Sequence, residues 1–297
     1  MLNETKAVAT VSGFTFIRNA ILYDYPVVEA ISSVLPLCDE FIVAVGNSDD
    51  STYDLIRSIP SDKIRIINTV WDDTLREGGR VLALEADKAF RVISPGATWA
   101  LYIQGDEVVH EKYLPEIGRA MDQYRDAPEV EGLLFNYLHF YGSYDFVGDS
   151  RKWYRREVRI VRNLPGISSY RDAQGFRLNQ RKLNVKKINA SIYHYGWVKS
   201  PSVQQLKQMN FNRYWHSDAW IGEKVPAVEA FDYSAIDSLE HFNGSHPEVM
   251  KNRIRSMNWE FPFDPTQKKF SPLHRFLHRM ETMTGWRIGE YRNYRII

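Results

Sequence analysis

The sequence has little of what marks secreted or membrane-spanning proteins. Cys38 is the one cysteine among 297 residues, so neither a disulfide framework nor a cysteine-based zinc site can form, and its apolar surroundings predict a buried thiol. Residues 1–6 are polar and lack the apolar run of a signal peptide, and no stretch approaches the roughly 20 apolar residues that span a bilayer. We therefore expect a cytoplasmic protein, with membrane contact limited to the periphery of the inner face.

An excess of charge of either sign is also missing. Lys and Arg number 38 and Asp and Glu 37, and the resulting net charge of +1 gives no field that would attract nucleic acid. Aromatic residues are abundant instead, with 17 Tyr, 15 Phe and 8 Trp. Aromatic rings stack on the apolar faces of sugars, but they also fill large cores, and composition does not separate these two uses.

Short apolar runs alternate with amphipathic stretches over the first hundred residues. The expected strands are 7–11, 41–45, 64–67 and 99–103, and the expected helices are 26–35, 51–59 and 81–93. This alternation is typical of a mostly parallel sheet covered by helices, in which ligands bind beyond the carboxyl ends of the strands. Three polar loops fall at that edge and indicate one site; they are 46–51, 72–80 and 104–107.

Asp106 and Glu107 are the strongest sign of a site, because they directly follow the apolar strand 99–103. Carboxylate oxygens suit hard cations such as Mg²⁺ or Mn²⁺, and such an ion neutralises the charge that a leaving diphosphate gains. A two-acid turn is also a common solvated loop. The other polar cluster, 46–52, permits a tight turn, and either caps the next helix through Asp50 or Ser51 or binds a base or ribose edge.

Taken in order, these features resemble a known enzyme family. The set is a strand, then Arg18-Asn19, Pro26-x-x-Glu29, Asp39-Glu40-Phe41-Ile42-Val43, the turn Asn47–Thr52 and Gln104-Gly105-Asp106-Glu107. It resembles family-2 glycosyltransferases over residues 7–200, and its Asp-Glu ending is similar to a bacterial branch that builds surface polysaccharides. The resemblance implies an α/β fold of the GT-A type, with a Rossmann-like, mostly parallel central sheet flanked by helices. It also implies an inverting, metal-dependent transfer of a sugar from a nucleotide-diphosphate donor to a glycan or lipid-linked acceptor.

The same resemblance implies roles for single residues. Gln104 stands where the family motif has its first acid, so Asp106 is expected to carry most of the metal binding and Glu107 to position neighbouring groups. His194 is expected to complete the Mn²⁺ or Mg²⁺ site, with its other ring nitrogen held by a partner; a structural histidine is the alternative. The residues expected at the nucleotide and its diphosphate are Ser12, Arg18, Asn47, Asp49, Asp50, Arg80, Gln104 and Lys199.

An inverting transferase needs a carboxylate that removes the proton of the acceptor hydroxyl. Asp172 lies where the family usually places this base and is our candidate. Asp145 and Asp149 compete for the role, and an ion pair with Arg171 is the structural alternative for Asp172.

We expect residues 1–200 to form the catalytic domain, with the nucleotide and metal half over 1–110 and the acceptor half over 111–200. Further strands are expected at 132–140, 158–161 and 190–195, and residues 201–297 are expected to form a mainly helical extension. In the stretch 273–283, apolar residues share one helical face opposite a basic face. This helix is expected either to lie on an anionic membrane or to pack on its own domain.

Two other functions remain open at this point. A nucleotidyltransferase acting on sugar phosphates would need a Gly-rich, Lys- or Arg-containing phosphate loop after the first strand, and 13–16 is a poor match. A non-catalytic protein that binds nucleotides or carbohydrates through a decayed site is favoured by the neutral Gln104.

Overall fold

The computed structural model describes residues 9–225 and 228–297. Of the strand expected at 7–11, residues 7 and 8 lie outside the described part, and the first strand is β1 at Val11–Ile17. The prediction therefore placed this strand too early, because Ser12, Gly13 and Thr15 interrupt the apolar pattern although β1 is buried along nearly its whole length.

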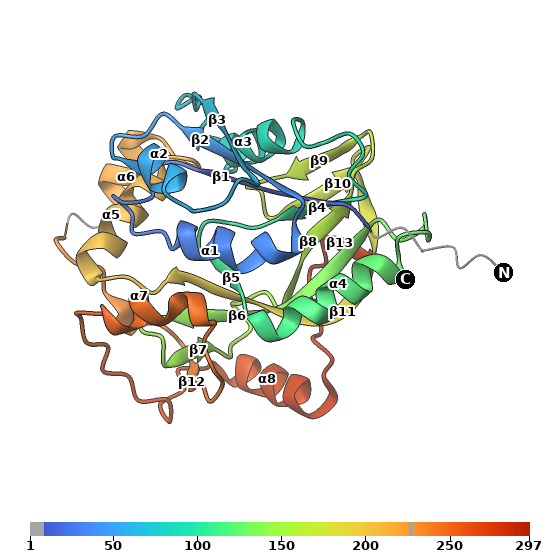
Figure 1. Cartoon of the computed structure of the whole chain (residues 1–297). Helices are drawn as coiled ribbons and strands as arrows, with labels where there is room; N and C mark the ends of the chain where they lie inside the picture. The colour runs from blue at the N-terminus through green and yellow to red at the C-terminus, as the bar shows by residue number, and fades with distance from the viewer. Residues whose placement is uncertain (1–8, 226–227) are drawn as a thin grey trace.

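Strands and helices alternate through the first half of the chain (Figure 1). The strands after β1 are β2 Glu40–Gly46, β3 Ile64–Thr69, β4 Trp99–Tyr102, β5 Glu107–Val109, β6 Gly132–Tyr141, β7 Phe146–Gly148, β8 Arg156–Arg162, β9 Ile167–Tyr170, β10 Gly175–Leu178, β11 Arg181–Trp197, β12 Leu239–His241 and β13 Tyr294–Ile296. The helices are α1 Val27–Val34, α2 Thr52–Arg57, α3 Arg80–Phe90, α4 Leu114–Gln123, α5 Pro201–Asn212, α6 Asp218–Lys224, α7 Lys251–Arg255 and α8 Pro272–Thr284. The predicted elements between 26 and 103 are confirmed to within a few residues.

The central sheet has the strand order β3-β2-β1-β4-β8-β6-β11-β10-β9. The pairs β3–β2, β2–β1 and β1–β4 are parallel, as βαβ units require. Along this order, the pairs from β4 onward are antiparallel except for β6 with β11. The predicted α/β architecture is thus confirmed. The strands that come first in the chain form a parallel half of the sheet, and the later strands form a mixed half beside it.

Helices cover both faces of the sheet (Figure 1). On one face α1 and α4 bury Val27, Ile31 and Ile117 against β1, β2 and β6. On the other face α3 buries Val81 and Ala86 beside the rings of β1 and β4. Cys38 is buried in the first of these clusters, as predicted. Both faces are closed by apolar packing, so polar side chains reach a ligand only at the edges of the sheet.

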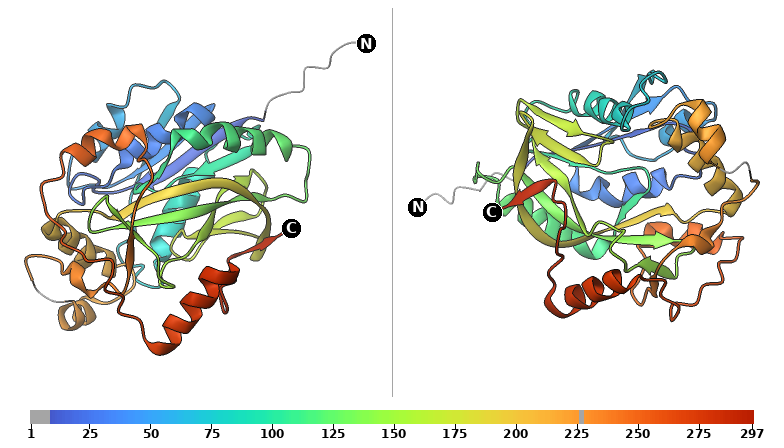
Figure 2. Two further views of the ribbon diagram at one scale, coloured as in Figure 1. Left: turned by 90° about the horizontal axis from the view of Figure 1, so that it is seen from below. Right: turned by 180° about the vertical axis from the view of Figure 1, so that it is seen from behind.

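The long strand β11 joins distant parts of the chain (Figure 2). Its last part pairs antiparallel with β5, so that His194 lies opposite Glu107. Its register against β6 shifts between His194 and Trp197, a bulge that redirects side chains at the carboxyl edge of the sheet. This pairing sets His194 beside the turn that carries Asp106, which lies 88 positions earlier in the sequence.

The segment 201–297 is tied to the sheet at two points. β12 pairs with β7, and β13 pairs in parallel with β11 (Figure 2). In the described part of this segment there are four α-helices, α5 to α8, and much of the chain between them is irregular. No helix in the described ranges is both long and apolar enough to cross a bilayer.

Candidate active site

One cavity of about 400 Å³ lies at the carboxyl ends of the parallel strands. Residues 16–18 line it from the end of β1, and residues 104–106 line it from the turn after β4. The mixed half of the sheet contributes His194 and the turn containing Asp172, and α5 contributes Lys207. The cavity thus collects charged groups from both halves of the sheet, at the edge where the sequence predicted one site.

The carboxylate of Asp106 is held in an electropositive pocket. Lys207 donates from Nζ to Asp106 Oδ2 at 3.2 Å and to the carbonyl oxygen of Gly196 at 2.9 Å. Burial opposes ionisation of Asp106, but nearby positive charge, above all that of Lys207, outweighs it and lowers its pKa to about 2. Asp106 is therefore a carboxylate at any physiological pH.

Gly196 makes this arrangement possible. A Cβ on Gly196 would lie 2.7 Å from Asp106 Oδ2 and 2.7 Å from His194 Cε1. No side chain fits between the carboxylate and the imidazole, so the close approach of the two depends on a glycine at the β11 bulge.

The protonation of His194 follows from its neighbour His139. His139 Nε2 faces the carbonyl oxygen of Tyr154 at 2.8 Å, and a carbonyl only accepts, so this nitrogen carries the hydrogen. The other nitrogen of a neutral His139 then accepts, and His194 Nδ1 donates to it at 3.3 Å. Burial lowers the pKa of both rings, well below the usual value for His139. His194 Nε2 is therefore left with a free lone pair, 3.7 Å from Asp106 Oδ1.

Asp106 and His194 are suitable as the protein ligands of a divalent cation. In the described ranges no three or more His, Cys, Asp or Glu gather as a complete site. Mg²⁺-type ions, however, are commonly held by one or two protein ligands, with the rest of the shell from water and substrate phosphates. The Oδ1 oxygen of Asp106 and Nε2 of His194 lie 3.7 Å apart beside the cavity, so these two residues would hold such an ion.

Glu107 has a different role from its neighbour. It is fully buried, and Arg159 donates to it from Nε and Nη2, each at 2.7 Å. Tyr137 also donates to Oε1 at 2.7 Å, and the backbone N–H of Gln104 donates to Oε2 at 3.1 Å. Glu107 therefore fixes the turn that carries Asp106, in line with the positioning role expected from the sequence.

Asp172 reaches the cavity from the turn between β9 and β10. Its neighbours Arg171 and Ala173 have positive φ angles of 56° and 61°, so this turn is tight. Arg171 lies over the rings of Tyr170 and Tyr291, and no ion pair joins it to Asp172 within the described ranges. Burial raises the pKa of Asp172 above its usual value. The carboxylate is thus free of the structural ion pair that the sequence left open.

The competing carboxylates lie elsewhere. Asp145 Oδ2 accepts from the Ser143 hydroxyl at 3.3 Å, and the backbone N–H of Asp145 donates to Ser143 Oγ at 3.1 Å, so both contacts stay within its own turn. Asp149 is paired with Lys268. Neither lines the 400 Å³ cavity.

The turn after β2 holds in place residues that line the cavity. Arg18 lines the cavity, donates to the carbonyl oxygen of Asn47 at 3.0 Å and pairs with Asp73 at 2.6 Å. Asn47 Oδ1 accepts from the backbone of Trp71 at 3.1 Å. A Cβ at Gly46 would meet the Trp71 indole at 2.4 Å, so the backbone of this turn packs directly against an aromatic ring.

Asp49 and Asp50 act within the same turn. Asp49 exchanges hydrogen bonds with the Asn19 side chain, at 3.1 and 2.7 Å. Asp50 accepts from the backbone N–H of Thr52 at 2.9 Å and of Leu22 at 2.7 Å. The capping alternative therefore accounts for Asp50.

Three further residues of the expected nucleotide set do not line the cavity. Ser12 lies near the amino end of β1 and donates to Glu40 at 2.6 Å, and Arg80 is exposed at the start of α3. Lys199 is completely buried, donates to the carbonyl oxygen of Asp24 and lies over the ring of Tyr25. Gln104 does line the cavity, and its amide nitrogen donates to the carbonyl oxygen of Ala173 at 3.3 Å.

Sequence reasoning missed several residues that line the cavity. Lys207 sits in a polar helix without a motif, and Arg159 sits in an ordinary strand pattern. The aromatic lining was also missed; it includes Tyr23, Tyr25, Trp71, Tyr154, Trp197, Phe211 and Tyr214. The high aromatic content was a signal for stacking surfaces, but only the fold shows which rings meet at one place.

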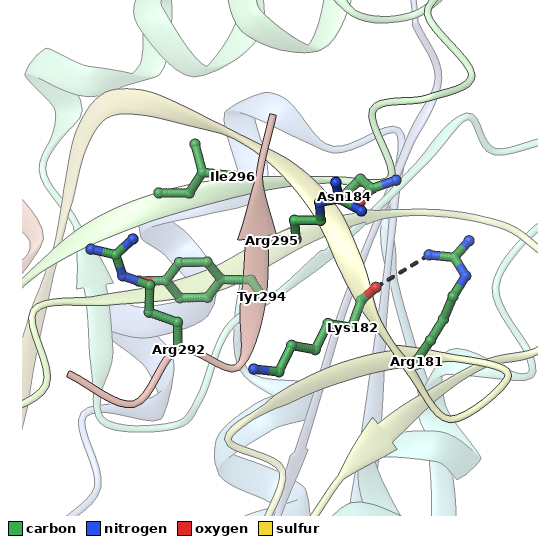
Figure 3. Close-up of a pocket in the computed structure, with 7 residues that line it drawn as sticks. All are labelled: Arg181, Lys182, Asn184, Arg292, Tyr294, Arg295 and Ile296. Carbon is green, nitrogen blue, oxygen red and sulfur yellow. Dashed lines mark hydrogen bonds between the residues drawn. The ribbon is translucent and has the colours of Figure 1, made fainter. Parts of the chain in front are cut away.

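A second hollow of about 730 Å³ lies at the other end of β11, beside β13 (Figure 3). Arg181, Lys182, Arg292 and Arg295 surround it, and Arg181 donates to the carbonyl oxygen of Lys182. No carboxylate, histidine or nucleophile is among the described residues that line it. It lacks the groups for catalysis that the cavity at Asp106 has.

Comparisons with known proteins give distant likenesses. No protein-family model and no curated protein sequence matches the chain. Among solved structures, S. aureus TarS 1–349 in complex with UDP is similar, with 16% identity over 45% of this chain and 37% of that chain and a TM-score of 0.35. 4-Diphosphocytidyl-2C-methyl-D-erythritol synthase from Anaerococcus prevotii has 14% identity over 69% of this chain and 98% of that chain, with a TM-score of 0.37.

Glucosyl-3-phosphoglycerate synthase from Mycobacterium tuberculosis, in complex with Mn²⁺, UDP and phosphoglyceric acid, is also similar. The identity is 20% over 44% of this chain and 43% of that chain, and the TM-score is 0.29. The chain thus spans less than half the length of TarS and of this synthase in these alignments.

Proposed function

We propose that the protein is a glycosyltransferase that takes a sugar from a nucleotide-diphosphate donor with the help of a divalent cation. The observation that carries this proposal is the composition of the single cavity at Asp106. It combines a carboxylate and an imidazole lone pair 3.7 Å apart, a separate carboxylate at Asp172 and aromatic walls. Such a cavity can hold a diphosphate at one end, stack a base or a sugar on its rings, and accept a proton at the other carboxylate.

The reaction assigns a task to each group. The acceptor hydroxyl attacks the anomeric carbon, its proton passes to Asp172, and the bond from the anomeric carbon to the diphosphate oxygen breaks with inversion. Burial favours this role for Asp172, because a raised pKa makes the carboxylate a better proton acceptor. A cation held by Asp106 and His194 would neutralise the negative charge that the leaving diphosphate gains.

A nucleotidyltransferase is less well supported by the geometry. Its phosphate loop would have to fall at 13–16, but these residues lie inside β1, paired with β2 and β4. A Cβ at Gly13 would meet the ring of Phe41 at 2.2 Å, so this glycine serves packing in the sheet.

A thermal-shift panel of UDP, GDP, CDP and ADP, with and without Mn²⁺, tests the proposal. We expect at least one nucleotide to stabilise the protein, by about 2.7 kcal/mol when its concentration is 100 times its Kd. Asp106→Asn should lose the part of the shift that depends on Mn²⁺. If none of the four nucleotides shifts the unfolding temperature in either condition, the proposal is wrong.

For the acceptor we propose a glycan or a lipid-linked glycan of surface-polysaccharide synthesis, handled at the inner face of the membrane. The support is α8, where Leu273 and Phe276 are 64% and 58% exposed rather than packed on the domain. Arg275 and Arg279 lie on the same exposed helix and would add about 1 kcal/mol each near anionic lipid.

Flotation with phosphatidylserine vesicles tests the membrane contact. Binding at low salt should be lost at high salt and in Phe276→Asp. Val228→Asp changes a half-exposed residue outside α8 and should bind like the wild type. Equal flotation of both variants, or none of the wild type, means that α8 is not a membrane anchor.

A further inference from the structure

Lys207 is the one charged side chain that α5 sends into the cavity at Asp106. The face of α5 that packs on the protein buries Gln204, Gln205 and Lys207, whereas a helix that only fills a core would bury apolar side chains there. The Lys207 ammonium has three donors and two protein acceptors, Asp106 Oδ2 and the carbonyl oxygen of Gly196. The ring of Tyr25, 4.8 Å away, accepts only weakly, so the ammonium retains donor capacity for a ligand.

The other cations that line the cavity are already committed. Arg159 is bound through two nitrogens to the buried Glu107, which has no further role in the cavity. Arg18 is paired with Asp73 and bonded to the carbonyl oxygen of Asn47. Lys207 differs, because its partner Asp106 is the same carboxylate that fits a divalent cation.

A divalent cation on Asp106 and an ammonium on the same carboxylate repel each other. The cation therefore binds well only when Lys207 has another anion to pair with. A diphosphate supplies that anion at the place where the cation also needs phosphate oxygens to complete its shell.

We propose that Lys207 is a diphosphate-binding residue that exchanges partners, leaving Asp106 for the diphosphate of the donor when donor and cation bind. The inference rests on the proposed function and adds a regulation of the same site. The nucleotide and the cation then bind cooperatively, and by linkage each raises the affinity for the other by the same factor.

The consequence is measured with Mn²⁺ by electron paramagnetic resonance of the free ion, and with UDP by calorimetry. In the wild type we expect weak Mn²⁺ binding alone and binding that is tighter by about 5- to 150-fold when UDP is saturating. In Lys207→Met, Mn²⁺ alone should bind more tightly than to the wild type, because Asp106 is released. UDP should bind at least about tenfold more weakly to this variant, and the cooperativity should fall.

Two variants serve as controls. Lys207→Arg keeps the charge and should retain the cooperativity. Lys63→Met removes a half-buried lysine that donates to two backbone carbonyls near the amino end of β3, and it should behave like the wild type in both titrations. Thermal unfolding of each variant verifies that it is folded.

The inference is overturned if Lys207→Met binds Mn²⁺ alone no more tightly than the wild type while it still folds. It is also overturned if UDP binds to this variant with unchanged affinity. The Mn²⁺ titration without nucleotide tests Lys207 independently of the donor, whereas failure of UDP, GDP, CDP and ADP to bind the wild type with or without Mn²⁺ would refute the proposed function.

Discussion

Neutralising Glu107 should lower the stability of the fold, whereas neutralising its neighbour Asp106 should leave the protein folded and abolish turnover. In Glu107→Gln an NH₂ group replaces one of the two carboxylate oxygens. Each of these oxygens accepts two hydrogen bonds, Oε1 from Arg159 and Tyr137 and Oε2 from Arg159 and Gln104. Either orientation of the new amide therefore sets its hydrogens against two donors and leaves the buried guanidinium without a charged partner.

The magnitude follows from burial. Glu107 and Arg159 have side chains only 0% and 1% exposed, and removing one partner of such a pair costs about 3–5 kcal/mol. For a chain of this size, that lowers Tm by roughly 6–20 °C. Chemical denaturation followed by tryptophan fluorescence measures the free energy of unfolding directly, and calorimetry gives Tm.

Asp106→Asn is the matched comparison. The pKa of Asp106 is lowered from 3.8 to about 2, so its charge contributes about 2 kcal/mol, less than the Glu107 pair. The variant should remain folded and lose turnover and the Mn²⁺-dependent binding of nucleotide. Glu107→Gln that unfolds at the wild-type midpoint, or Asp106→Asn that turns over normally at saturating Mn²⁺, would refute this division of roles.

Two further changes test the site, and a third tests a buried carboxylate outside it. Asp172→Asn should slow the chemical step by about a hundredfold or more while nucleotide affinity in calorimetry is unchanged, and loss of nucleotide binding instead would assign Asp172 to the donor site. Gly196→Ala should abolish turnover and destabilise by about 1–3 kcal/mol because its Cβ meets Asp106 and His194, whereas Gly222→Ala in α6, with nothing within 4 Å, should be tolerated. Burial raises the pKa of Glu157 from 4.5 to about 7, so its contribution to stability is fully present below pH 4.5 and is lost as pH rises through 7. Glu157→Gln should therefore be more stable than the wild type at pH 8, by up to about 3 kcal/mol, with the difference shrinking toward pH 4.5; equal pH dependence of the two would show that Glu157 titrates normally.

Much of the parallel half could be predicted from the sequence. β2, α3 and β4 are continuous apolar or amphipathic runs closed by polar turns, and local periodicity is sufficient to locate them. β1 was placed too early because small polar residues inside a nearly fully buried strand resemble the end of a strand. β11 was foreseen only at 190–195, because its first part at 181–189 is polar and half exposed, and its length depends on pairing with β6, β10 and β13.

In the site, too, some features could be predicted from the sequence and others could not. The sequence by itself placed Asp106 and Glu107 after a buried strand, because a polar pair that ends an apolar run is a local feature. It also pointed to His194 and Asp172, through the order of motifs along the chain. Only the tertiary structure decided that Glu107 is a buried ion-pair partner while Asp106 faces the cavity, since that depends on which strand lies alongside.

Sequence patterns could not predict which residues contact the motif residues. Lys207, His139 and Arg159 meet the motif residues across 101, 55 and 52 positions of the chain, respectively. Electrostatic and hydrogen-bond partners are chosen by distance in space, and sheet pairing and the packing of α5 set those distances. The sequence determined the chemistry that each segment carries, and the fold determined which of these groups act on one another.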